Sequence, residues 1–268
     1  MKRGFVDGKD VRLAYVDFGG SGLHAVLLHG AMSRAANWFE TALWLREKYH
    51  VIGIDQRGHG RSDKPDSGYT RANLVEDIAN ALSELNVREA IVIGHSMGAL
   101  IAWGLAIAYP QVVKALILVD KGARAPPKEA LEDWKEWFQS WPVPFSCLKE
   151  ARHYFENIRP SFGDHFMELL EERKSGYWPL FHFEHILAAL RFSLGKSWWD
   201  ELDRIECPTL IIKGEESQFR RKDAEKMAQI IPQGRFVEIP EAGHVVYDDQ
   251  PGRFREAVEN FLIDVSLY

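Results

Sequence analysis

Residues 90–108 read AIVIGHSMGALIAWGLAIA and decide the fold. Ala90–Ile93 is an apolar run without polar alternation, which is typical of a strand buried on both faces of a parallel sheet. Ala99–Ala108 has the composition of a helix. Between them, Gly94-His95-Ser96-Met97-Gly98 fits Gly-x-Ser-x-Gly, in which a serine on a sharp strand-to-helix turn points its hydroxyl out of the sheet. This context predicts Ser96 as a nucleophile.

The rest of the chain repeats the strand-and-helix pattern of this stretch. Helical patterns such as Asn73–Leu85, with leucine or isoleucine every three or four residues, lie between short apolar runs. Phe5 and Val11–Phe18 are predicted to pair as a hairpin across Asp7-Gly8. The fold class is therefore α/β, with a mostly parallel, doubly wound sheet and helices on both faces. Further strands are predicted at residues 24–28, 51–55, 115–119, 208–214 and 235–239.

Residues 122–203 have a different character, because they are rich in aromatic residues and divided by prolines into short helices. No strand is predicted there, and Glu168–Lys174 is interpreted as a solvated helix face. We expect an α/β core domain of residues 1–121 and 204–268, interrupted by a helical cap subdomain of residues 122–203. The cap aromatics indicate either an apolar acyl or alcohol pocket or a small core of the cap itself.

Composition narrows the class of protein. The 268 residues are 46% hydrophobic and 27% charged, as in soluble globular proteins, and the net charge of −6 argues against nucleic acid and anionic membranes as partners. Met1–Asp10 is charged where a signal peptide would be apolar, and no run of 18 apolar residues occurs. Cys147 and Cys207 match no metal spacing and are expected to be free thiols. These features predict a cytoplasmic protein with no membrane contact.

A serine hydroxyl needs a base to remove its proton during attack. His244, in Glu241-Ala242-Gly243-His244-Val245, directly follows the last predicted strand. The carboxyl ends of parallel strands share one edge of a sheet, so His244 and Ser96 are expected to meet there. The oxyanion hole is predicted from the backbone N–H groups of Ala31 and Met97.

Several motifs together resemble the alpha/beta-hydrolase superfamily, especially its small capped serine esterases and cofactor-free haloperoxidase-like members. The resemblance covers nearly the whole chain and implies a Ser–acid–His triad in that order. The motifs are His29-Gly30, the run Asp55–Asp63, Gly94-His95-Ser96-Met97-Gly98 and Gly243-His244.

The acid is where the sequence departs from this family. Its usual place, three or four residues beyond Gly214, holds Ser217 and Gln218, which do not ionise as carboxylates. Asp120 is favoured as the replacement, because a carboxylate at a strand's carboxyl end faces the catalytic edge. Glu216, one residue earlier in the usual loop, is the alternative acid. A third alternative is that no acid is present and the chain is a weakened enzyme or a ligand-binding derivative.

The expected function is a carboxylesterase or lipase-like hydrolase that cleaves small to medium apolar esters through an acyl-enzyme. This chemistry requires no cofactor and no metal, and its partner is a small-molecule ester. Lactonase, perhydrolase and carbon–carbon bond hydrolase remain alternatives, because they use the same triad. Ser96 argues against dehalogenase or epoxide hydrolase chemistry, which would need an aspartate nucleophile. The oligomeric state is not predicted.

Overall fold

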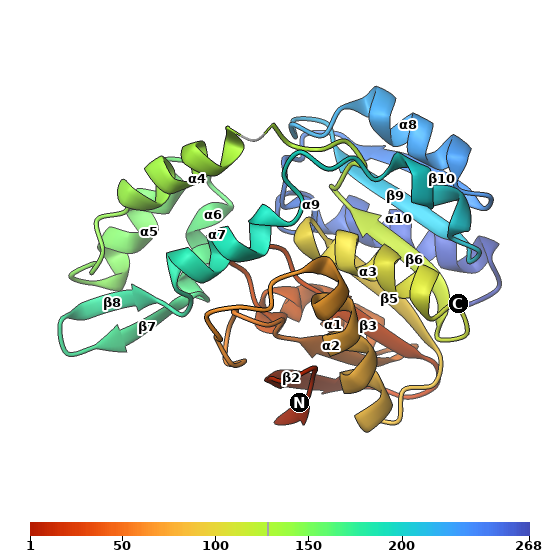
Figure 1. Cartoon of the computed structure of the whole chain (residues 1–268), viewed down its shortest axis with the longest axis horizontal. Helices are drawn as coiled ribbons and strands as arrows, with labels where there is room; N and C mark the ends of the chain where they lie inside the picture. Colours follow the sequence, from red (N-terminus) through yellow and green to blue (C-terminus); the bar gives the residue numbers. More distant parts are fainter. Residues whose placement is uncertain (128) are drawn as a thin grey trace.

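The computed structural model describes residues 1–127 and 129–268. Its centre is an eight-stranded sheet with the order β1-β2-β4-β3-β5-β6-β9-β10. β2 is antiparallel to both of its neighbours, and every other pair is parallel. The predicted mostly parallel sheet and its N-terminal hairpin are confirmed (Figure 1). The strands are β1 (Lys2–Asp7), β2 (Arg12–Gly19), β3 (His24–Leu28), β4 (His50–Ile54), β5 (Ala90–His95), β6 (Val113–Val119), β9 (Thr209–Gly214) and β10 (Gly234–Ile239).

The strand order reverses at β3, which positions the site. From β3 the chain moves outward to β4 and then crosses back, so β5 pairs with β3 on its other side. In open α/β sheets, ligands bind beyond the carboxyl ends of the strands at such a switch point. Ser96 follows β5 directly and therefore lies at this place.

Helices cover both faces of the sheet, so that its central strands are buried on both sides. Within β3, Val26 and Leu28 belong to one apolar cluster, and Ala25 and Leu27 belong to the other. Because successive side chains of a strand point to opposite faces, this division explains the uninterrupted apolar run. The main helices are α1 (Phe39–Leu45), α2 (Arg71–Glu84), α3 (Met97–Ala108), α8 (Arg221–Ile230) and α10 (Pro251–Asp264), with the short α9 (Val246–Asp249) before the last.

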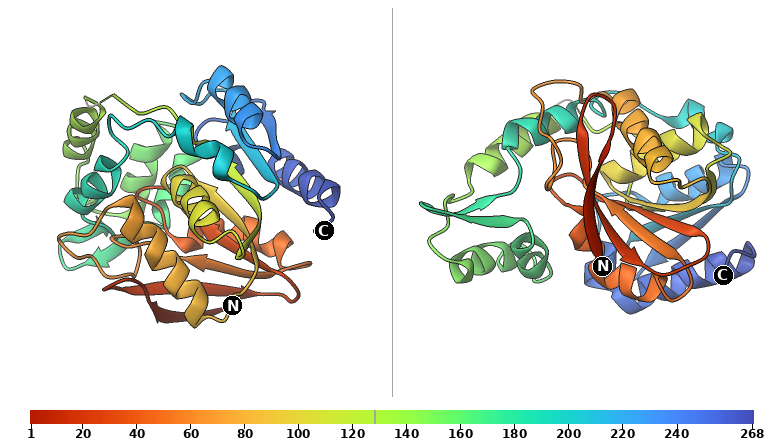
Figure 2. Two further views of the ribbon diagram at one scale, coloured as in Figure 1. Left: turned by 45° about the vertical axis from the view of Figure 1, so that its right-hand side comes forward. Right: turned by 90° about the horizontal axis from the view of Figure 1, so that it is seen from below.

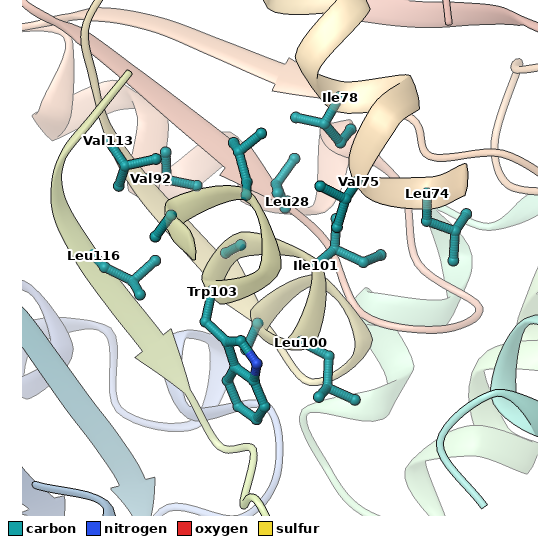
Figure 3. Packing of buried hydrophobic residues seen from close by; sticks show 14 of the residues in the cluster. Leu28, Leu74, Val75, Ile78, Val92, Leu100, Ile101, Trp103, Val113 and Leu116 are labelled. Atoms are coloured by element: carbon teal, nitrogen blue, oxygen red, sulfur yellow. The ribbon is translucent and has the colours of Figure 1, made fainter. Parts of the chain in front are cut away.

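The first cluster joins α2, α3 and α8 to the sheet, and the second joins α1 and α10 to the opposite face. On α2, Leu74 and Ile78 are spaced four residues apart, so both lie on the face that packs inward. Figure 3 shows Leu74 and Ile78 on α2 and Leu100 and Ile101 on α3, and all four belong to the first apolar cluster. The 3.6-residue periodicity of the sequence therefore predicts the buried face of this helix correctly.

The segment between β6 and β9, where the sequence predicts a cap, lies to one side of the sheet in Figure 1 and in the right-hand view of Figure 2, and we call it the cap. The expectation that no strand occurs there is wrong, because Leu170–Arg173 (β7) and Gly176–Pro179 (β8) form a two-stranded antiparallel sheet. The helix interpretation of Glu168–Lys174 fails for the same reason. Lys174 and Ser175 form the turn between these strands, and Gly176, directly after the turn, has φ 125°, which a helix does not allow. The cap helices are α4 (Ala130–Gln139), α5 (Leu148–Glu156), α6 (Phe162–Met167) and α7 (Phe183–Arg191).

The cap aromatics pack largely on one another and form a separate apolar cluster. Phe155 and Phe166 stack with ring centroids 4.3 Å apart, and Trp141 lies edge-on to both. Met32, from the loop after β3, joins this cluster and connects the cap to the core. Trp198, inside the predicted cap range, packs instead with the core cluster, so the boundary at residue 203 stays a prediction.

Within the described ranges, no helix is long and apolar enough to cross a membrane. The same ranges hold no group of three or more His, Cys, Asp or Glu side chains arranged to bind a metal ion. Cys147 is exposed and Cys207 half-buried, and both are free thiols as expected.

Candidate active site

Ser96 occupies the strained turn between β5 and α3. Its backbone has φ 51° and ψ −114°, a region that residues other than glycine rarely adopt. Close backbone packing around the turn requires the flanking glycines. A Cβ on Gly94 would lie 2.5 Å from the Gly98 carbonyl oxygen, and a Cβ on Gly98 would overlap the Leu28 carbonyl. These contacts explain why the sequence has glycine on both sides of Ser96.

Asp120 directly follows β6 and directs its carboxylate at His244. The Asp120 side chain is 1% exposed, and its Oδ2 lies 2.7 Å from His244 Nδ1. Its Oδ1 accepts hydrogen bonds from the Gly214 backbone N–H at 3.0 Å and from Ser217 Oγ at 2.7 Å. A carboxylate opposite Nδ1 selects the tautomer with the proton on Nδ1, which leaves the Nε2 lone pair free to accept a proton.

The structure separates the two candidate acids. Asp120 reaches His244, whereas Glu216 is 53% exposed and pairs with Arg159 of the cap, with Oε2 at 3.0 Å from Nη2. Ser217, at the family's usual acid position, donates its hydroxyl to Asp120. The loop after β9 therefore does not supply the carboxylate that meets His244. It donates a hydrogen bond to Asp120, which follows the neighbouring strand β6. Nothing in the sequence signals this role of Ser217.

His95, the residue before Ser96, contacts His244 and so connects it to the serine turn. The sequence analysis did not predict this contact. His95 Nε2 is 2.8 Å from the His244 carbonyl oxygen, and the two rings are 4.7 Å apart. Burial lowers the pKa of His95 well below its usual range, so its neutral ring donates through Nε2. Within the described residues, no hydrogen bond joins Ser96 Oγ to His244. Such bonds are often long before substrate binds.

The predicted oxyanion donors lie on both sides of Ser96. Met97 is the first residue of α3, so its N–H has no acceptor within the helix. A Cβ on Gly30 would lie 3.2 Å from Ser96 Cβ, which brings the loop that carries Ala31 against the serine. His29 Nδ1 is 2.7 Å from the Gly30 carbonyl, and His29 Nε2 accepts from the backbone of residue 56, so a buried imidazole supports this loop.

Lys121 adds a positive charge next to the acid. This residue is half-buried, and within the described residues it forms no ion pair. Burial lowers its pKa to about 8, and Asp120 opposes this shift. A half-buried ammonium group without a partner side chain is suited to bind an anionic group of a ligand.

The sequence of this chain matches one protein family over most of its length. The alpha/beta hydrolase fold family matches residues 25–251. The chain belongs to the alpha/beta-hydrolase family. The resemblance of the sequence motifs to the alpha/beta-hydrolase superfamily is thereby confirmed, and the fold and the relatives make the chain a hydrolase.

Relatives within the alpha/beta-hydrolase family differ in substrate. The 2-(acetamidomethylene)succinate hydrolase of Mesorhizobium japonicum is 29% identical over 91% of this chain and 89% of its own. The crystal structure of E-2-(acetamidomethylene)succinate hydrolase has a TM-score of 0.89 at 26% identity, covering 98% of this chain and 99% of that one. A marine microorganism esterase has a TM-score of 0.78, also at 26% identity, covering 93% and 99%.

Proposed function

We propose that this hydrolase cleaves carboxylic esters of small to medium-sized substrates through an acyl-enzyme on Ser96. The observation that carries the proposal is the 2.7 Å contact between Asp120 Oδ2 and His244 Nδ1, which lies beside the strained serine turn. A buried carboxylate, an imidazole and a serine at a helix N-terminus form the group of side chains that acyl transfer requires.

In the first half of the reaction, Ser96 Oγ forms a bond to the ester carbonyl carbon while His244 Nε2 takes the hydroxyl proton. The carbonyl electron pair moves onto oxygen, and the N–H groups of Ala31 and Met97 stabilise the resulting oxyanion. The intermediate then collapses, the bond to the alcohol oxygen breaks, and the imidazolium gives its proton to the departing alcohol. Asp120 stabilises the imidazolium throughout this step.

In the second half, water attacks the acyl carbon and gives its proton to His244 Nε2. A second oxyanion forms in the same donor pair and collapses to release the carboxylic acid. Ser96 regains its proton from the imidazolium, which restores the starting state. No step requires a metal or an organic cofactor.

Labelling with a fluorophosphonate probe tests the nucleophile. We expect rapid labelling of the native chain, located at Ser96 by mass spectrometry and abolished in Ser96→Ala. Hydrolysis of p-nitrophenyl esters from acetate to dodecanoate then tests the substrate class, with short to medium acyl chains expected to be fastest. Failure of the native chain to react with the probe would favour a ligand-binding derivative and overturn the proposal.

Lys121 favours a second candidate, an acyl substrate that carries a carboxylate. The relative named 2-(acetamidomethylene)succinate hydrolase acts, by its name, on an acetamido derivative of succinate, which is a dicarboxylate. Lys121 directly follows Asp120 in the sequence, and its ammonium, which forms no ion pair within the described part of the chain, is the candidate partner for one such carboxylate. The same nucleophile and base would then cleave an amide instead of an ester. Turnover of N-acetyl and O-acetyl derivatives of dicarboxylic acids, compared with neutral esters, separates the two candidates.

A further inference from the structure

We propose that Arg159 of the cap is a positioning residue that holds the backbone carrying His244 in place. The proposal rests on the proposed function only in taking His244 as the base. The guanidinium group of Arg159 connects the cap to the edge of the sheet where His244 lies. Arg159 is therefore expected to act on catalysis through His244, without contact with the substrate.

Arg159 lies in the turn between α5 and α6, and its guanidinium binds Asp249 at the end of α9 and Glu216. Its Nε is 3.1 Å from Asp249 Oδ1, and its Nη2 is 3.1 Å from Asp249 Oδ2 and 3.0 Å from Glu216 Oε2. Burial opposes the charged form of Arg159, but the hydrogen bonds to Asp249 and Glu216 outweigh it and raise its pKa. Planar two-point pairing with a carboxylate is a geometry that arginine provides and lysine does not.

Asp249 also hydrogen-bonds to Gly243, the residue before His244. Its side chain is 5% exposed, and its Oδ2 accepts the Gly243 backbone N–H at 2.7 Å. The guanidinium lies directly against Gly243, because a Cβ there would be 2.6 Å from Arg159 Cζ. On the opposite side, the Gly243 carbonyl lies so close to Gly214 that a Cβ on Gly214 would overlap it. The Gly243 peptide is therefore clamped between the end of β9 and the cap arginine.

The clamp is one of three anchors on His244. Asp120 holds its ring and His95 holds its carbonyl oxygen, and both belong to the core. Of these three anchors, the one at Gly243 depends on the cap, through Arg159. Removing Arg159 leaves Asp249 as a buried carboxylate without its cation, and such a charge draws in water or shifts its backbone. A displacement of about 1 Å in a catalytic group can cost about a hundredfold in rate.

The direct test is the proton NMR signal of the His244 Nδ1–H group, which hydrogen-bonds to Asp120 and shifts to low field. Its loss in His244→Asn assigns it, and it can be recorded without any substrate. The variants are Arg159→Ala, Arg159→Lys and Asp249→Asn. Arg152→Ala is the matched control, because Arg152 is a cap arginine that pairs with Glu156 and Asp164, both within the cap.

We expect the signal to broaden or vanish in Arg159→Ala and Asp249→Asn, and to persist in Arg152→Ala. The rate of fluorophosphonate labelling at Ser96 should fall about 10- to 100-fold in the first two variants, with KM for an ester nearly unchanged. Arg159→Lys should recover part of the rate, because it keeps a cation beside Asp249. Melting temperatures show which variants are folded.

The proposal is overturned if folded Arg159→Ala keeps both the native signal and the native labelling rate. If Arg159→Ala does not fold, Asp249→Asn decides in the same way. A native chain that shows the signal and its dependence on Arg159, yet never reacts with the probe, would refute the proposed function and leave the positioning role supported.

Discussion

Replacing Asp120 by asparagine is the sharpest test of the site, because the surroundings of the side chain fix its orientation. The amide oxygen must face the Gly214 N–H and Ser217 Oγ, which now donate to Oδ1. The NH₂ group then faces His244 Nδ1, where a donor cannot oppose another donor. The imidazole therefore moves its proton to Nε2, and in that tautomer it cannot accept the proton of Ser96.

The size of the effect follows from the same contacts. Turning the amide over would leave the buried Gly214 N–H unpaired, at a cost of about 1–3 kcal/mol. The harmful orientation is therefore favoured by roughly 10- to 100-fold. The orientation therefore accounts for only part of the loss, and the remainder comes from the missing negative charge that stabilises the imidazolium. In a serine triad, the corresponding aspartate-to-asparagine change lowers kcat about 10⁴-fold in total, which is about 5.5 kcal/mol of lost transition-state stabilisation. We expect Asp120→Asn to lose activity on this scale while keeping its fold.

The assay is ester turnover, with the melting temperature as a check on folding. Asp17→Asn is the matched control, because Asp17 also bonds a histidine, His50, at 3.0 Å on β2. It should stay near wild-type activity, and Glu216→Gln should lose far less than Asp120→Asn. Retention of more than about a tenth of the activity in Asp120→Asn, or an equal loss in Glu216→Gln, would refute this reasoning.

Three further outcomes are expected. Lys121→Met should raise KM about tenfold for esters bearing a carboxylate and leave neutral esters unchanged; in the native chain this preference should fade as pH rises through about 8, where Lys121 loses its proton. Burial lowers the pKa of His29 from 6.5 to about 4. As the pH falls below 6.5, His29 is therefore protonated in the unfolded chain before it is protonated in the folded one. The free energy of unfolding should consequently decrease by about 3 kcal/mol between pH 6.5 and pH 4. Urea unfolding should show that loss reduced in His29→Gln, and an unchanged loss would contradict it. Phe155→Ala should cost about 3–5 kcal/mol in the same assay, because Phe155 is fully buried in the cap cluster, and a loss below about 1 kcal/mol would contradict this.

The sequence alone determined the elements of the core and the edge of the sheet where chemistry is expected. Short apolar runs such as His24–Leu28 become central strands because both of their faces are buried. Ser96 and His244 reach the same edge because parallel strands end together there. These conclusions depend on local pattern and on the rules of parallel sheets, and neither requires knowledge of distant contacts.

Only the tertiary structure decided which carboxylate meets His244. Asp120 and Glu216 both follow strands at the same edge, and the choice between them depends on contacts made across long stretches of sequence. Ser217 and Gly214 orient Asp120 from more than 90 residues away, while Arg159 of the cap draws Glu216 aside. The β7–β8 hairpin was missed because its four-residue strands carry no clear alternation. Such features depend on side chains that are brought together only when the chain folds, so local sequence cannot reveal them.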